Sequence, residues 1–532
     1  MKILKSTLLI LLLLAANVSC GASSVSSGSQ RDGNAPELMG VDPQAIKEFV
    51  EKLRAVPETD IHHVVIARKN SIIAEGHFAP FAKNDVHTLY SCSKTFTMLA
   101  IGMLVDDGKL RLTDKVVDLL PDKAPKRQSA ALKAMTVKHL LIMGAGIKPS
   151  LTLRMESNDW ARTWLAQPVT KLGKFQYDSM CTFMLSAIVQ RITGKKLLDF
   201  LNERFFHPLG IYEADWEESP DGINVGGWGL RLTAESMAKA GMCIMHKGKW
   251  NGKQLVSAKW IEEASQKHNN YSNPRKKATD TNQGYCYQMW RCLLPGAFRA
   301  DGAYGQFIVM SPQHDLVVVI TGVSKNTGKE LACIWNHLIP GVKDIPEPAR
   351  DDKGRQLMPE MTRMDVSQQL KRLSITRNDI DSVKLELGSN ARSYKTMSIK
   401  FWENEHGISV DDCCKMRVTR TDGTIAEYDF LSNDWAKRTT TQAPPYNNAV
   451  RPVNLSEIKG LKGEYTTAGW YGFDDNKLIL KLYWTNWIVC NTFTIDFHDD
   501  GTATITNDEG YPGTDPEIIK ASYIFYKRPV SK

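Results

Sequence analysis

Apolar residues alternate with the period of β-strands in two segments, residues 62–78 and 306–323. Residues 62–78, HHVVIARKNSIIAEGHF, have the pattern of a hairpin that turns at Lys69-Asn70. Residues 306–323, QFIVMSPQHDLVVVITGV, predict two further strands joined by a turn that contains proline.

Between these strands the apolar positions follow helical spacing. Residues 92–110 predict one apolar helix, and residues 182–206 predict another that is interrupted at Gly194. Strands at both ends with helices between them predict an α+β domain over residues 45–342, in which helices flank an antiparallel sheet.

The pattern changes after residue 342. Residues 343–375 are rich in proline and charge and predict a linker, and residues 376–532 predict a smaller all-β domain, a sandwich or a barrel. Strand clusters near 383–432 and 460–507 suggest two sheets. The aromatic segments YTTAGWYGF and KLYWTNW could form a ligand-binding or glycan-binding face, or else the core of this domain.

The first twenty residues have the features of an export signal. Two early lysines precede an aliphatic run, Leu8 to Ala16, that is too short to span a bilayer, and small residues lead up to Cys20. The segment Asn17 to Gly21 resembles a bacterial lipoprotein cleavage site, although Asn17 replaces the usual leucine. We expect lipidation at Cys20, a flexible tether over residues 21–44 and a place in the bacterial cell envelope, facing the periplasm or the exterior; simple secretion is the alternative.

The composition of the chain bears on its partners, its disulfides and its cofactors. The net charge of +8 is spread over 67 basic and 59 acidic residues without a basic block, which argues against nucleic acid as a partner. Ten cysteines in 532 residues are too few for a disulfide scaffold, and six of them lie in apolar surroundings typical of small core residues. These six are Cys92, Cys181, Cys243, Cys286, Cys292 and Cys333. No motif with metal-ligand spacing is present, so we expect neither metal nor cofactor.

The segment YSCSKTFTML places Ser91 three residues ahead of Lys94 at the start of an apolar helix. Residues three apart share one helix face, so the amine can reach the hydroxyl and activate it as a nucleophile. The spacing alone is weak evidence, because Ser456 and Lys459 repeat it in a polar stretch. The alternative is an N-cap serine with a solvated lysine.

Further segments follow Ser91 in a recognisable order: Tyr177-Asp178-Ser179 before a helix, GGWGLRLTAESMAKAG with its glycine-rich turn, and RADGAYGQFIVMSPQHDLVVVITG. Together they resemble the serine β-lactamase-related hydrolases, near the class C β-lactamase, D-aminopeptidase and nylon-oligomer-hydrolase branch, over about residues 45 to 340. The resemblance implies a β-lactamase/transpeptidase-like fold with a helical subdomain.

The resemblance also implies roles at matching positions. Ser91 would attack the acyl carbonyl, and Lys94 and Tyr177 would share the proton transfer, with the identity of the base left open. The backbone N–H groups of Ser91 and Ala303 would form the oxyanion hole, and Gly302 would let the strand approach the substrate.

Two departures from penicillin-recognising relatives point away from β-lactamase or D-Ala peptidase activity. Ala300 stands where those relatives carry a cation, and Ser179 replaces a frequent asparagine. Asp301 would repel an anionic substrate if it faces the cleft, and it could instead point away. Further candidates for the pocket are Trp228, Tyr285 and Trp290, although aromatic residues after glycine turns are often core residues.

The expected function is therefore that of an exported serine hydrolase that acts on a small or peptide-like ester or amide. The alternative is a penicillin-binding-like sensor that keeps the fold and does not turn over. The sequence does not indicate the ligand of the C-terminal domain.

Overall fold

The computed structural model describes most of the chain from residue 35 to residue 527. The described ranges are 35–149, 157–269, 279–344, 364–365, 380–403, 409–440, 444, 459–461, 465–474, 477–511 and 514–527. The predicted export signal, Cys20 and nearly all of the predicted linker lie outside these ranges.

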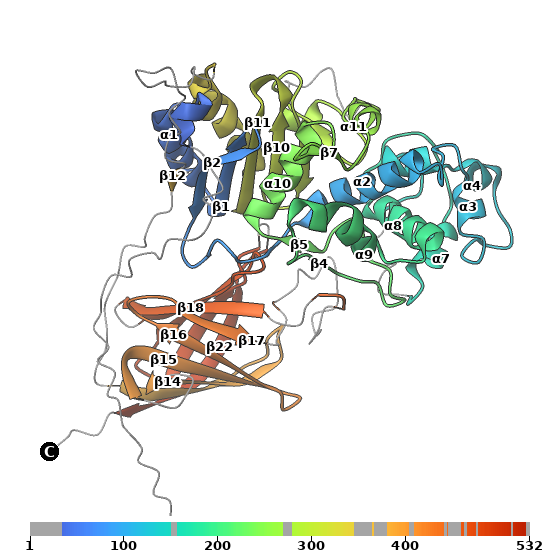
Figure 1. The fold of residues 1–532 in the computed structure, drawn as a ribbon. Coiled ribbons are helices and arrows are strands. Elements are labelled where there is room, and N and C mark those ends of the chain that lie inside the picture. Colours follow the sequence, from blue (N-terminus) through green and yellow to red (C-terminus); the bar gives the residue numbers. More distant parts are fainter. Residues whose placement is uncertain are drawn as a thin grey trace, which may run out of the picture.

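The first half of the chain builds a seven-stranded sheet in the order β12-β2-β1-β11-β10-β9-β8 (Figure 1). Its pairs are antiparallel, except that β12 lies parallel to β2. The predicted hairpin is confirmed, with Lys69 and Asn70 at φ 52° and 59° between β1 and β2. The strands are β1 (Thr59–Arg68), β2 (Ser71–His77), β8 (Trp290–Arg291), β9 (Phe298–Gly302), β10 (Gln306–Ser311), β11 (Leu316–Ser324) and β12 (Met364–Asp365).

Helices cover both faces of this sheet. Successive residues of a strand point to opposite faces, and both faces carry apolar side chains that must be buried. Val65 of β1 belongs to the core shared with α10 (Ala234–Met245), whereas Val64 belongs to the core shared with α1 (Pro43–Arg54) and α12 (Thr327–Cys333). The expected α+β domain with an antiparallel sheet and flanking helices is confirmed.

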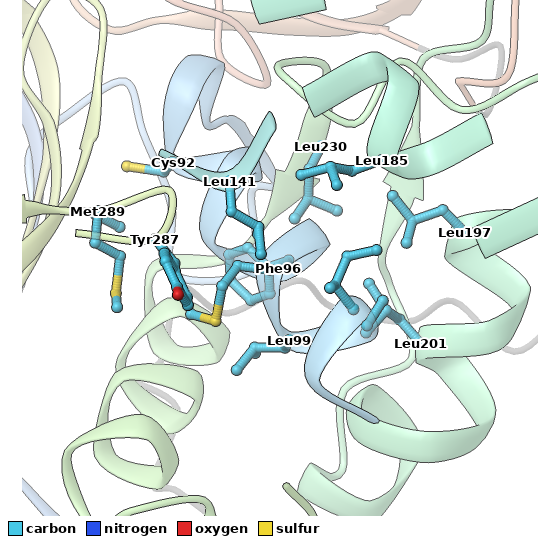
Figure 2. Close-up of a cluster of buried hydrophobic side chains, with 14 of the residues drawn as sticks. Cys92, Phe96, Leu99, Leu141, Leu185, Leu197, Leu201, Leu230, Tyr287 and Met289 are labelled. Atoms are coloured by element: carbon cyan, nitrogen blue, oxygen red, sulfur yellow. The ribbon is translucent and has the colours of Figure 1, made fainter. Parts of the chain in front are cut away.

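The remaining helices form a subdomain beside the sheet around α2 (Ser93–Asp106), which is buried over almost its whole length (Figure 1). Phe96 and Leu99 of α2 pack among side chains from five other segments, including Leu141, Leu185, Leu201 and Tyr287 (Figure 2). A rigid helix therefore carries the segment that contains Ser91. The subdomain includes α3 (Val116–Leu119), α4 (Ala130–Ala134), α5 (Val137–Leu141), α7 (Trp160–Leu165), α8 (Ser179–Thr193), α9 (Leu197–Leu201) and α11 (Ala258–Ala264). Gly194 ends α8 at φ 69°.

The C-terminal part is an all-β barrel (Figure 1). Of the two predicted architectures, a sandwich or a barrel, the barrel is confirmed. Its strands form one ten-stranded sheet that the β16–β18 pairing closes, so the expectation of two separate sheets is wrong. Because the sheet closes, each strand in the order from β16 to β18 pairs with a strand on both of its sides. The strands are β13 (Ile380–Leu387), β14 (Tyr394–Glu403), β15 (Ser409–Arg420), β16 (Ile425–Leu431), β17 (Ala436–Thr440), β18 (Tyr465–Asp474), β19 (Lys477–Trp484), β20 (Cys490–Phe497), β21 (Thr502–Asp508) and β22 (Glu517–Lys527).

Most aromatic side chains of the segments YTTAGWYGF and KLYWTNW lie inside this barrel. Tyr465, Tyr471, Trp484 and Trp487 are each at most 3% exposed and belong to its core. The core alternative is therefore confirmed for these residues.

The barrel contacts the first half of the chain at several points. The Tyr483 hydroxyl donates to Asp60 at the start of β1 (2.7 Å), and Lys459 Nζ donates to the Pro220 carbonyl (2.9 Å). A second group of contacts, at Tyr90 and Tyr304, lies next to the candidate site.

The six cysteines predicted as core residues are all buried, and the nine cysteines in the described ranges are free thiols. Among the residues that the structure places, no helix has the length and apolar character needed to cross a membrane.

Candidate active site

Ser91 lies in a short 3₁₀ turn, Tyr90–Cys92, immediately before α2. The turn is fastened to its neighbours on both sides. Ser93 Oγ donates to the Tyr90 carbonyl (2.6 Å) and accepts the N–H of Leu230 (3.2 Å), and Cys92 Sγ donates to the Gln306 carbonyl on β10 (3.1 Å). Ser91 therefore occupies a fixed position between the helical subdomain and the sheet.

Lys94, one turn along α2, is 1% exposed and lies among three oxygen atoms. Its Nζ is 2.8 Å from Ser91 Oγ, 3.0 Å from Ser179 Oγ and 2.6 Å from the Gly227 carbonyl. The solvated-lysine alternative is wrong, since this amine is buried and directed at the serine. Three polar partners satisfy the hydrogen-bonding capacity of the amine without water.

The glycine-rich turn supplies one of these partners. A Cβ on Gly227 would lie 2.7 Å from the Ser179 carbonyl, so only glycine lets this backbone approach Lys94 and α8 so closely. Asp178 caps α8 by accepting the N–H of Met180 (2.9 Å), and this cap holds Ser179 at the helix start.

Tyr177 completes the group around the serine, because its hydroxyl hydrogen-bonds Ser91. Burial raises the pKa of the Tyr177 phenol; the hydrogen bond with Ser91 lowers it, and the nearby Asp301 carboxylate raises it further. The ring stacks on Trp290 with centroids 5.8 Å apart and meets Tyr285 edge-on at 6.1 Å. The phenol therefore keeps its proton beside Ser91.

The end of β9 runs beside the turn that carries Ser91. A Cβ on Gly302 would collide with the Leu89 carbonyl, so glycine is required for the strand to lie this close. Gln306 fixes the following turn by donating to the carbonyls of Ala303 (3.1 Å) and Gly322 (2.7 Å). The exposed Ala303 therefore sits on a braced turn adjacent to Ser91.

The Beta-lactamase family profile matches residues 49–337, more than half of the chain. The chain belongs to the beta-lactamase family. It is a serine hydrolase by that membership. It is similar to 6-aminohexanoate-dimer hydrolase of Paenarthrobacter ureafaciens, at 24% identity over 322 residues, 55% of this chain and 80% of that enzyme.

Two other relatives cover different shares of the chain. Penicillin-binding protein 4 of Amycolatopsis lactamdurans is 26% identical over 162 residues, 29% of this chain and 41% of that protein. Among solved structures, the octameric penicillin-binding protein homologue from Pyrococcus abyssi aligns with a TM-score of 0.44 and 14% identity, over 90% of this chain and 99% of that one.

Within this beta-lactamase family member, Asp301 is held by Arg299, two residues earlier on β9. Arg299 Nε donates to Asp301 Oδ2 (2.8 Å), and the Arg299 side chain is 1% exposed whereas that of Asp301 is 27% exposed. Burial raises the pKa of Asp301, while Arg299 and Lys94 act in the opposite direction. The carboxylate is thus the accessible member of the pair, and it lies within electrostatic range of Lys94 and Tyr177.

The other residues considered for the pocket occupy different environments. Trp290 is half-buried beside Tyr177, and Tyr285 is buried against both of them. Trp228 is 6% exposed and stacks on Trp160 in the core of the helical subdomain.

Sequence reasoning missed the Gly227 carbonyl, the Arg299 partner of Asp301 and Phe175, which packs against Tyr285 with centroids 5.2 Å apart. The i, i+2 spacing of Arg299 and Asp301 on a predicted strand could have revealed the pair, since such residues share a face. No sequence signal marks a main-chain acceptor such as Gly227.

Glu330 of α12 lies beneath the turn that carries Ala303. A Cβ on Gly305 would be 2.6 Å from its Oε2, so the carboxyl packs directly on this backbone. Burial raises the pKa of Glu330 to about 8, and the Asp301 carboxylate adds to the shift.

Replacing Glu330 by glutamine is therefore expected to make the protein progressively more stable than wild type as the pH rises from about 5 to 8. In that window the unfolded carboxyl is ionised and the folded one is neutral, so wild-type stability falls by up to about 1.4 kcal/mol per pH unit. Urea unfolding of both proteins at four pH values measures the difference. Parallel curves for the two proteins would contradict the assignment.

Proposed function

We propose that this protein is an exported serine hydrolase that cleaves an ester or amide through an acyl-enzyme on Ser91. The observation that carries the proposal is the position of Lys94 Nζ, buried and 2.8 Å from Ser91 Oγ. A serine becomes a nucleophile when a neighbouring base removes its proton, and no other amine or imidazole is in direct contact with Ser91 among the described residues.

The contacts of Lys94 favour the amine as that base. The Gly227 carbonyl can only accept a hydrogen bond, and Ser179 Oγ can accept a second one. A neutral amine that donates to these two oxygens has its lone pair left for the Ser91 proton. The raised pKa of Tyr177 argues against a phenolate, so the phenol is better suited to pass a proton to the departing group.

The reaction then proceeds in two balanced steps. Ser91 Oγ bonds to the acyl carbon while its proton moves to Lys94, and the backbone N–H groups of Ser91 and Ala303 stabilise the oxyanion. The bond to the alcohol or amine breaks as that group receives a proton through Tyr177 and Lys94. Water then cleaves the acyl-enzyme, releases the acid and restores the serine hydroxyl.

The substrate is proposed to carry an acyl part without a carboxylate. Ala300 provides no cation on β9, and the accessible carboxylate of Asp301 disfavours anions while accepting a neutral or cationic group. The name of the Paenarthrobacter relative describes hydrolysis of a 6-aminohexanoate dimer, which is an amide of an amino acid. That chemistry is compatible with this site.

Export and lipidation at Cys20 remain part of the proposal. They are supported by the basic start, the aliphatic run and the position of Cys20. Mass analysis of the N-terminal peptide from the membrane fraction tests them: an unmodified Cys20 in a full-length chain would contradict both.

The test of the proposed activity is intact-mass spectrometry of the purified protein after exposure to a fluorophosphonate, to p-nitrophenyl butyrate and to benzylpenicillin. A fluorophosphonate adduct that maps to Ser91, with release of several equivalents of p-nitrophenol, supports the hydrolase. A stable penicillin adduct with no turnover of the ester would favour the penicillin-binding-like sensor instead, and absence of any Ser91 adduct would refute the proposal.

Replacing Asp301 by asparagine is expected to change acyl selectivity. Asparagine keeps a hydrogen bond to Arg299 and removes the charge, so kcat/KM for an ester with a terminal acyl carboxylate should rise about tenfold relative to that for its neutral analogue. The measurement compares glutaryl and butyryl p-nitrophenyl esters on both proteins. An unchanged ratio would show that the Asp301 charge does not reach the acyl group.

A further inference from the structure

Two tyrosines with unusual backbone conformation flank the proposed oxyanion hole. Tyr90 precedes Ser91 and has φ 45°, and Tyr304 follows Ala303 and has φ 66°. Residues with a Cβ rarely adopt this left-handed region, and they keep it only where surrounding contacts enforce it. The two proposed N–H donors are therefore each adjacent to a strained residue.

The side chains of both residues contact the C-terminal barrel. The ring of Tyr304 packs edge-on against Tyr90 with centroids 5.5 Å apart, and it meets Tyr511 of the barrel at 6.1 Å. Tyr90 also hydrogen-bonds Tyr511, which is 3% exposed. Both site tyrosines pack against the hydrophobic core of the barrel.

We propose that Tyr511 is a positioning residue that holds Tyr90 and Tyr304 in their left-handed conformations, so that the barrel supports the oxyanion hole. The inference rests on the proposed function, because the N–H donors of Ser91 and Ala303 matter only if Ser91 is acylated. Among the described residues, Tyr511 contacts Tyr90 and Tyr304, the neighbours of Ser91 and Ala303. It acts through the backbone beside Ser91 and Ala303.

The barrel is also attached to the N-terminal domain at sites away from Tyr511. Lys459 attaches it there through bonds with residues 218 and 220. The Tyr304 carbonyl accepts the N–H of Ser324 (2.9 Å), which ties the strained turn to the end of β11. Tyr511 contacts the side chain of Tyr304, while Ser324 binds its backbone.

The test uses full-length variants Tyr511→Ala and Tyr511→Phe, with Tyr483→Phe as the matched control. Tyr483 is also a barrel tyrosine whose hydroxyl bonds to the N-terminal domain, and among the described residues its contacts include Asp60, Phe81 and Trp435 but neither Tyr90 nor Tyr304. Each variant is assayed well below its own melting temperature for kcat and KM with p-nitrophenyl butyrate and for the rate of fluorophosphonate labelling.

We expect Tyr511→Ala to lower kcat about 10- to 100-fold with KM within about twofold, since displaced oxyanion donors weaken transition-state binding selectively. Tyr511→Phe should show a smaller loss, and Tyr483→Phe should stay within about twofold of wild-type kcat. In the Tyr511→Ala background, Tyr304→Gly should recover part of kcat, because glycine adopts positive φ without strain.

Other outcomes separate this inference from the proposed function. A wild-type kcat in a folded Tyr511→Ala, or an equal loss in Tyr483→Phe, would overturn the positioning role. If Tyr511→Ala does not fold, an unchanged kcat in Tyr511→Phe would also overturn the positioning role. Failure of wild-type Ser91 to label would instead refute the proposed function on which this inference rests.

Discussion

Ser91→Ala is expected to lower kcat/KM for p-nitrophenyl butyrate by about 10⁴-fold or more. The proposed mechanism has no other group that can form the acyl-enzyme, and loss of a nucleophile that acts with its base removes the contribution of the whole unit. The oxyanion donors and the binding pocket remain, so a small residual rate above that of water is expected. Ester hydrolysis under identical conditions measures the effect.

The control for this variant is Ser456→Ala. Ser456 begins the second S-x-x-K of the chain, in a polar stretch, and its replacement should leave both the rate and the labelling unchanged. A Ser91→Ala protein that keeps more than about 1% of wild-type activity, or that still gives a stoichiometric fluorophosphonate adduct, would remove Ser91 from the role of nucleophile.

Much of the fold could be predicted from local patterns in the sequence. The β1–β2 hairpin could be predicted because strand alternation and the Lys69-Asn70 turn both lie in a short segment, and Gly194 marked the end of α8 for the same reason. Closure of the barrel could not, because it depends on β16 meeting β18 across intervening chain. The pairing of Met364–Asp365 with β2 likewise depends on a long-range contact.

The same distinction applies to the site. Ser91, Lys94 and Tyr177 were found because their motifs occur in a recognisable order, and the structure brings all three into contact. The environment that tunes them was not found, since the Gly227 carbonyl is main chain and Tyr511 lies more than 400 residues from Ser91. Motifs therefore predict candidate residues, whereas packing between distant segments sets the surroundings of those residues.

Lys94→Ala is expected to lower both kcat/KM and the rate of fluorophosphonate labelling by about 10³-fold or more, because the base that accepts the Ser91 proton is lost. Lys94→Arg should be no better than Lys94→Ala, since a guanidinium remains protonated and its planar fork does not fit a site shaped around an amine that is 1% exposed. Pre-steady-state labelling of the wild type and both variants measures these effects.

Tyr177→Phe provides the comparison that assigns the roles. It keeps the ring stacked on Trp290 and removes only the hydroxyl, so we expect a loss of about 10²-fold in ester hydrolysis and a smaller loss in labelling. If labelling fell further in Tyr177→Phe than in Lys94→Ala, the phenol rather than the amine would be the base. The pKa of Tyr177, which burial raises, argues against that result, because a phenol that holds its proton tightly cannot take one from serine.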